Sequence, residues 1–133
     1  MFPGAVNALD KIAEAGILLA IATGKGRRGL ELTLERHNLR DRFAVLKTAD
    51  DGPSKPNPKI LLDVMAELGA SDDCTIMLGD TSHDMAMAKA AGVSSIGVAW
   101  GYHPPEELKI YGAAEIINSY EEAPSAVIKI LGC

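Results

Sequence analysis

Short apolar segments alternate with segments of helical periodicity along this chain, and that alternation limits the folds open to it. The sequence predicts strands at residues 17–22, 43–46, 75–78, 95–99 and 114–118. The apolar spacing predicts helices at 6–15, 30–37, 59–68, 85–91 and 125–131. The run at 17–22 is continuously apolar, as in a strand buried on both faces. Alternating strands and helices indicate parallel βαβ units, so we expect one α/β domain over residues 1–133.

Charge and composition narrow the class of partner. The net charge of −5 arises from 18 acidic and 13 basic residues with no basic run, which argues against a nucleic acid or a membrane surface as partner. The amino terminus lacks the features of a signal peptide, and the apolar stretch at 15–22 is too short to span a bilayer. We therefore expect a cytoplasmic protein whose two cysteines, Cys74 and Cys133, are reduced thiols.

Polar groups follow the first two predicted strands. Thr23 and Gly24 come after the first strand, where a hydroxyl and backbone N–H groups at a helix start can bind a phosphate oxygen, although such a threonine can also simply cap the helix. Lys55 lies in a loop with Pro56 and Pro58, which we expect to hold the backbone extended and the ammonium group in place. A fixed cation would stabilise a transferring phosphoryl group; a solvated surface lysine is the alternative.

The strongest signal is the loop from Gly79 to Asp84, which follows the third strand. It carries two carboxylates, Asp80 and Asp84, at the carboxyl end of a strand, where open α/β sheets bind their ligands. One aspartate can cap the helix that follows, but capping does not explain the second. Paired carboxylates suit a hard cation, so we expect a Mg²⁺ site here.

Taken together, Thr23, Lys55 and the Gly-Asp-x-x-x-Asp loop resemble motifs two, three and four of the haloacid dehalogenase superfamily. Pro3-Gly4, the Lys-Pro-x-Pro segment and Gly97-Val98-Ala99-Trp100-Gly101 are similar to phosphoglycolate-phosphatase-like members. The resemblance implies a Rossmann-like three-layer α/β/α fold with a mostly parallel sheet. It also implies a Mg²⁺-dependent hydrolase that acts on small phosphorylated metabolites through an aspartyl-phosphate.

The resemblance also implies a role for each candidate residue. Thr23, with Gly24, would bind the phosphoryl oxygens, and Lys55 would neutralise charge on the phosphate and the nucleophile. Asp80 would bind Mg²⁺ directly, and Asp84 would help to hold it directly or through water. Thr23, Lys55 and Asp80 are thus the expected catalytic residues.

One family feature has no counterpart in the sequence. The first motif, Asp-x-Asp-Gly, supplies the nucleophile and lies on the central strand, between those of motifs two and four. Asp50-Asp51-Gly52 has similar letters, but it lies between motifs two and three, so we interpret it as a turn. The cap domain is also missing. We expect the carboxy-terminal portion of a longer enzyme, through a mis-set start or a fragmentary gene; a genuine short protein is the alternative.

A missing central strand would leave two sheet edges unpaired. Those edges must be filled or must close up and pair, and unfilled edges favour self-association. The alternative function is a non-catalytic module that binds Mg²⁺ and phosphate or pairs its open sheet with another polypeptide. A phosphoacceptor signalling domain fits less well, because it needs an acidic pair after its first strand and has no Gly-Asp-x-x-x-Asp loop.

Overall fold

The strands form two parallel sheets rather than one. The computed structural model describes residues 4–101 and 103–131. In the first sheet β1 (Ala20–Ala22) pairs with β2 (Val45–Lys47), with Ile21 opposite Leu46. In the second sheet the order is β3-β4-β5, formed by β3 (Ile76–Gly79), β4 (Ser94–Val98) and β5 (Glu115–Ile117). All pairs are parallel, as the alternation predicted.

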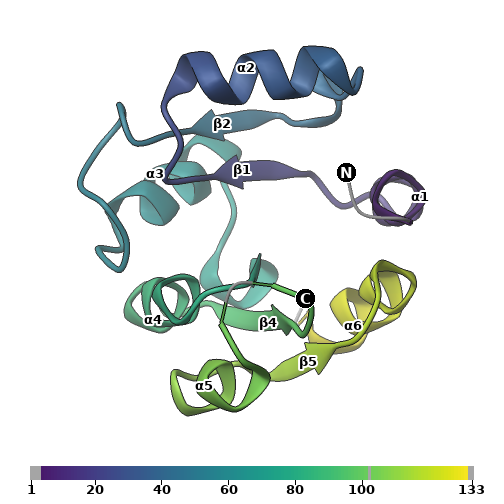
Figure 1. Cartoon of the computed structure of the whole chain (residues 1–133), viewed down its shortest axis with the longest axis vertical. Coiled ribbons are helices and arrows are strands. Elements are labelled where there is room, and N and C mark those ends of the chain that lie inside the picture. Colours follow the sequence, from purple (N-terminus) through teal and green to yellow (C-terminus); the bar gives the residue numbers. More distant parts are fainter. Residues whose placement is uncertain (1–3, 102, 132–133) are drawn as a thin grey trace.

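Helices cover both faces of the strands, which gives three α/β/α layers. Helices α1 and α6 lie on one side and α3 and α4 on the other, with α2 and α5 at opposite ends (Figure 1). The helices are α1 (Ala5–Glu14), α2 (Arg27–Arg36), α3 (Lys59–Leu68), α4 (Ser82–Ala90), α5 (Pro105–Ile110) and α6 (Ala123–Ile130). Single 3₁₀ turns lie at Arg40–Arg42, Asp72–Cys74 and Tyr120–Glu122.

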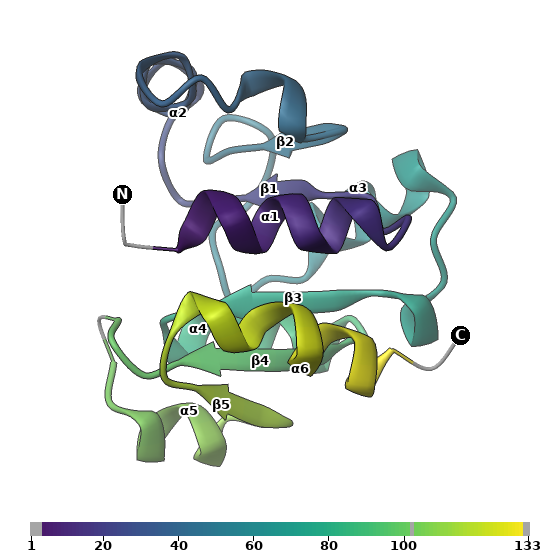
Figure 2. The same ribbon diagram turned by 90° about the vertical axis from the view of Figure 1, so that its right-hand side faces the viewer.

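The break between the sheets lies between β1 and β3. Figure 2 shows the strands in the order β2, β1, β3, β4, β5 from top to bottom. Within the described residues no ladder joins β1 to β3, so the two edges have not closed up. We call this pair of unpaired edges, of Ala20–Ala22 and Ile76–Gly79, the open seam. It lies where the family resemblance places the missing central strand.

Helices that bridge both sheets explain why the seam does not close. On one face, Leu61 and Met65 of α3 pack with Met77 of β3 and with Ala22 of β1. On the other, Ile12 of α1 packs against the second sheet, while other residues of α1 reach the first. Because close packing fixes the spacing between elements, these helices hold the two sheets apart while joining them.

Most predicted elements are correct to within one to three residues, and one prediction is wrong. The run at 17–22 is a strand only over Ala20–Ala22, which is half-buried, and Leu18 is 64% exposed. Within the described residues β1 is paired on one edge, and the unpaired edge leaves its side chains more accessible than those of a strand inside a sheet. By contrast α3 begins and ends as predicted and closes at Gly69 in the left-handed conformation (φ 65°).

Two further observations concern the cysteines and membranes. Cys74 is disulfide-bonded in the structure, so the expectation of a reduced thiol was wrong there; Cys133 lies outside the described residues. Spacing along the chain does not determine which side chains meet in the fold.

Among the residues that the structure describes, no helix has both the length and the apolar character needed to cross a membrane.

Candidate phosphate and metal site

The loop after β3 is closed by a reciprocal cap at the start of α4. Thr81 is the N-cap, and its Oγ1 accepts a hydrogen bond from the Asp84 N–H at 3.2 Å. In return Asp84 Oδ2 accepts from the Thr81 N–H at 3.2 Å and from its hydroxyl at 3.0 Å. Of the two aspartates in the motif, Asp84 therefore takes part in capping. Its side chain is buried, so this carboxylate is held rigidly.

Lys55 meets the same carboxylate from a different loop. Its Nζ donates to Asp84 Oδ1, and the pair is mostly shielded from solvent, with side-chain exposures of 19% and 5%. The alternative of a solvated surface lysine is therefore excluded. Removing one partner of a buried pair leaves an uncompensated charge, so each residue depends on the other.

The backbone at Lys55 differs from the prediction. The Lys55–Pro56 peptide bond is cis, and the Asn57 N–H donates to the Ser54 carbonyl at 3.1 Å. The segment is thus a turn rather than an extended stretch. An X–Pro bond tolerates the cis form, which the two prolines alone could not reveal.

Asp80 lines a pocket at the carboxyl end of the second sheet. This pocket has a volume of about 680 Å³ and is lined by Leu78, Gly79, Asp80, Val98, Trp100, Gly101 and Tyr120. Trp100 and Tyr120 pack edge to face with ring centroids 4.7 Å apart. Burial raises the pKa of Tyr120, and the negative charge of Asp80 raises this pKa further. The negative charge of Asp80 therefore acts on Tyr120, a side chain that lines the same pocket.

Two glycines make room for the two aspartates. A Cβ added to Gly79 would lie 2.5 Å from Asp84 Cβ, and one added to Gly101 would overlap Asp80 Cβ. Both distances are shorter than real side chains allow. Gly79 therefore allows the tight turn from β3 into α4, and Gly101 allows the loop after β4 to approach the loop after β3.

Thr23 lies at the end of β1, in the other sheet. Its N–H donates to the Lys47 carbonyl at 3.0 Å, and its Oγ1 accepts from the Lys25 N–H at 3.2 Å. Gly24 and Lys25 are exposed. The loops that follow β1, β3 and β4 leave the sheets on the same side in Figure 2, so Thr23 shares an end of the molecule with Asp80.

The oxygen ligands at this site are of the type that Mg²⁺ prefers, but they are too few to complete its coordination. Mg²⁺ takes about six oxygen ligands in octahedral geometry, mostly water, phosphate and one or two carboxylates. Within the described part of the chain no group of three or more acidic, histidine or cysteine side chains could hold a metal. Asp80 offers a carboxylate at the pocket, whereas the oxygens of Asp84 already accept from Lys55 and Thr81. The site therefore fits a cation whose remaining ligands come from elsewhere.

Two residues of this site were not predicted as functional. Thr81 forms half of the cap, and the Thr-x-x-Asp spacing within the motif could have indicated it. The ring Nδ1 of His103 accepts a hydrogen bond from the backbone N–H of Ser82 at 2.8 Å. The backbone N–H of His103 donates to the Asp80 carbonyl at 3.1 Å. His103 thus anchors the loop that carries Asp80, and no local pattern predicts a contact across that sequence separation. His83 is exposed.

Comparison with known proteins identifies the class. Residues 1–98 match the family model described as haloacid dehalogenase-like hydrolase. The chain belongs to this family.

Two curated relatives are phosphatases by name. The chain is 37% identical over 132 residues to the "Probable phosphatase IndB" of Dickeya dadantii, which covers 98% of the chain and 57% of that protein. It is 29% identical over 123 residues to the phosphoglycolate phosphatase of Salmonella paratyphi A, covering 92% of the chain and 49% of that protein. The chain thus spans roughly half of these relatives' length.

Solved structures agree on the fold. A predicted phosphatase from Clostridium acetobutylicum superposes with a TM-score of 0.88 at 28% identity, covering 96% of this chain and 60% of that one. A hydrolase from Pseudomonas syringae gives 0.87 at 25% identity, covering 98% and 63%. The predicted family and the predicted α/β fold are both confirmed.

Proposed function

We propose that this chain is the phosphate- and metal-binding part of a Mg²⁺-dependent phosphomonoester hydrolase similar to phosphoglycolate phosphatase. The observation that carries the proposal is the Lys55–Asp84 pair, which joins two loops that the sequence assigned separately to a phosphate and a metal. Asp84 packs against Gly79, which lines the same pocket as Asp80. The substrate would be a small phosphorylated metabolite in the cytoplasm, since the net charge of −5 argues against a nucleic acid.

Each residue has a distinct task in this proposal. The Thr23 hydroxyl and the Gly24 N–H bind phosphoryl oxygens, while Lys55 neutralises charge on the phosphate. Asp80 binds the metal, and Asp84 positions Lys55 and supports the metal directly or through water. Bound Mg²⁺ would stabilise negative charge on the phosphoryl group.

The nucleophile would come from outside these 133 residues. A carboxylate oxygen would attack phosphorus as the P–O bond to the alcohol breaks, and water would then hydrolyse the acyl phosphate. Asp50 and Asp51 do not supply it, because both carboxylates are held by Arg27. A strand seated in the open seam would bring a carboxylate to the end of the sheet where Asp80 lies.

The open seam also favours a second candidate, a module that pairs with another polypeptide without catalysis. Unpaired strand edges accept an added strand through backbone hydrogen bonds. Leu78, on the β3 side of the seam, is 36% exposed, which is unusual for a strand flanked by helices. The same edges would support self-association of the chain.

Phosphate release from an aryl phosphate separates the two candidates. The assay compares the chain alone with the chain plus a synthetic peptide that has an apolar strand followed by Asp-x-Asp-Gly. Each is run with Mg²⁺ and with EDTA, and beside Asp80→Asn. A peptide with both aspartates replaced by asparagine is the matched control. We expect no release by the chain alone, and Mg²⁺-dependent release with the first peptide that Asp80→Asn abolishes.

The other outcomes are equally informative. Release by the chain alone that Asp80→Asn abolishes would contradict an external nucleophile. Equal binding of both peptides without release would favour the pairing module. If calorimetry detects no binding of either peptide, the open seam does not accept an added strand, which contradicts both candidates.

A further inference from the structure

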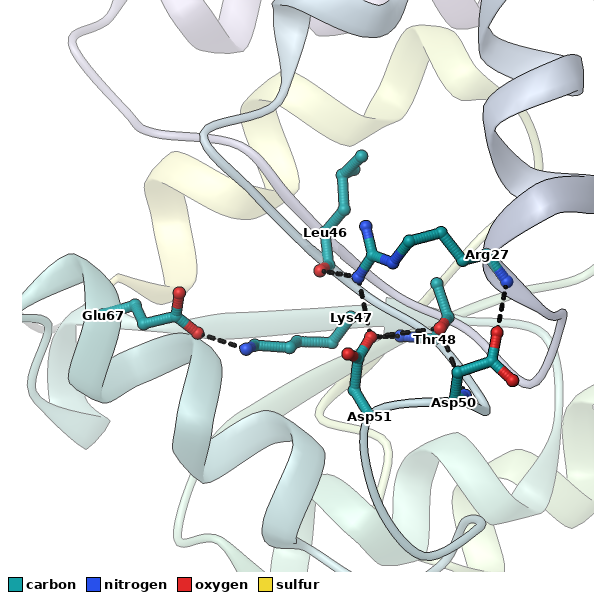
Figure 3. A network of polar contacts seen from close by, with 7 residues as sticks. All are labelled: Arg27, Leu46, Lys47, Thr48, Asp50, Asp51 and Glu67. Carbon is teal, nitrogen blue, oxygen red and sulfur yellow. Dashed lines mark hydrogen bonds and ion pairs between the residues drawn. The ribbon is translucent and has the colours of Figure 1, made fainter.

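Asp51 lies at the centre of a polar network that the roles proposed above do not use. Its Oδ2 accepts three hydrogen bonds: from the Thr48 N–H at 2.8 Å, from the Thr48 hydroxyl at 3.0 Å and from Arg27 Nη2 at 2.7 Å (Figure 3). Arg27 Nη2 also donates to the Leu46 carbonyl at 2.8 Å. Thr48 is fully buried. The network therefore joins the end of β2 to the first residue of α2.

Two more contacts join the same two loops. The backbone N–H of Arg27, at the start of α2, donates to Asp50 Oδ2 at 2.8 Å. The Ala49 N–H donates to the Lys25 carbonyl at 2.9 Å. Arg27 is thus held at its backbone by one aspartate and at its guanidinium by the next, as Figure 3 shows. The α2 amino terminus, which attracts anions, already has a carboxylate on it.

The position of this network in the chain gives it a consequence for the site. Residues 23–26 connect β1 to Arg27, and residues 52–54 connect Asp51 to Lys55. The network is therefore the link between the loop that carries Thr23 and the loop that carries Lys55. The β1–β2 ladder offers only three residue pairs to fix that relation, and charge-assisted hydrogen bonds are stronger than neutral ones.

We propose that Asp51 is a positioning residue, which through Arg27 and Thr48 fixes the Thr23–Gly26 loop relative to Lys55 so that both can contact one phosphate. This inference rests on the proposed function. Groups that share a phosphate must be held to within about half an ångström, and side chains on loops need supporting contacts to achieve it. The Thr48 N–H and then the Arg27 side chain lower the pKa of Asp51 to about 2, so the carboxylate is ionised at neutral pH.

A neighbouring ion pair provides a matched control. Lys47, at the end of β2, pairs with Glu67 of α3 at 2.5 Å. This pair lies beside the network in Figure 3 but connects β2 to a helix rather than to the Thr23 loop. Removing Glu67 therefore costs one ion pair of the same region without touching the link between the two loops.

The test compares Asp51→Ala and Asp51→Asn with Glu67→Ala in the 133-residue chain. Amide hydrogen exchange is measured at Lys25 and Arg27, and inorganic phosphate is titrated by NMR, with affinities corrected for the folded fraction. We expect Asp51→Ala to speed exchange at both amides and to weaken phosphate binding about tenfold, and Glu67→Ala to do neither. Asp51→Asn, which keeps an acceptor oxygen but no charge, should fall between them and serves if Asp51→Ala does not fold.

The inference fails if the Asp51 variants match Glu67→Ala in exchange and in phosphate affinity. If the unmodified chain binds no phosphate, the proposed function fails instead, and the exchange comparison alone decides whether Asp51 fixes the loop. Faster exchange throughout the chain, rather than at Lys25 and Arg27, would also overturn it, because that result indicates a general loss of stability.

Discussion

The two sheets of this molecule are stabilised in different ways. In the second sheet β4 is buried along most of its length, and Ile96, Met85, Met87 and Leu108 are completely inaccessible to solvent. In the first sheet β1 is half-buried throughout, and ion pairs of Arg27 and Lys47 tie its loops and helices together. One half of the fold depends on apolar packing and the other more on polar links.

The open seam accounts for much of this difference. Strand β4 has paired neighbours on both edges and helices on both faces, whereas β1 has one paired edge. A strand without a second neighbour leaves backbone groups and side chains accessible to water. The functional groups divide the same way: Asp80 and Asp84 lie on the well-packed half, while Thr23 and Lys55 lie on loops of the other.

The largest effect is expected from core truncation in the two sheets. Ile96→Ala empties a fully buried position in β4 and should lower the free energy of unfolding by about 3–5 kcal/mol. Ile21→Ala, in half-buried β1, should cost only about 1–2 kcal/mol. Urea denaturation of both variants measures the difference. Equal losses in the free energy of unfolding would show that the two sheets are equally well packed, which contradicts the comparison.

A smaller effect is expected where the aspartate loops approach the glycines. The Cβ of Gly101→Ala would collide with Asp80, so this variant should lose about 1–3 kcal/mol of stability. It should also move Asp80 and bring the pKa of Tyr120 partly back toward its ordinary value, because burial raises that pKa most and the Asp80 charge raises it further. Thermal denaturation and a spectroscopic titration of tyrosine measure the two results.

The matched control is Gly29→Ala in α2, where an added Cβ meets nothing within 4 Å. A helical glycine replaced by alanine should gain about 0.5–1 kcal/mol, so the two substitutions should have opposite signs. If Gly101→Ala leaves the stability unchanged, the loops at the site accommodate an added methyl group as readily as the surface of α2 does.

The sequence predicted the order and type of elements well, because apolar runs and helical spacing are local signals. The family resemblance implied that Lys55 and Asp84 belong to one site, and the two side chains form an ion pair in the structure. The absence of the central strand was inferred from the missing motif, and the break between β1 and β3 agrees with it.

What the sequence could not give depends on contacts between distant residues. Helix α2 starts at Arg27, three residues before the prediction, and Asp50, distant in the sequence, accepts from its first N–H. The half-burial of β1 depends on which strand lies beside it, not on its own apolar residues. The anchoring of Ser82 by His103 likewise joins segments that no periodicity relates.

The smallest effect is expected from pH, because the groups concerned are partly exposed and such pairs contribute little. The pKa of Asp51 is lowered to about 2 from an ordinary value of 3.8, so the folded state binds its proton less readily than the unfolded state. Its contribution to stability is therefore complete above about pH 4 and is lost as the pH falls toward 2. The stability difference between the unmodified chain and Asp51→Asn should shrink over that interval.

The Lys47–Glu67 pair should show the opposite dependence. The hydrogen bond with Glu67 raises the pKa of Lys47 above 10.5, so this contribution is complete below that pH and is lost as the pH rises through the raised value. Urea denaturation of Asp51→Asn and Glu67→Gln from pH 2 to pH 11 measures both. If the stability difference between Asp51→Asn and the unmodified chain is the same at pH 2 and at pH 7, the Asp51 carboxylate is not ionised in the network. That result would contradict the view that charged contacts of Asp51 stabilise the first sheet.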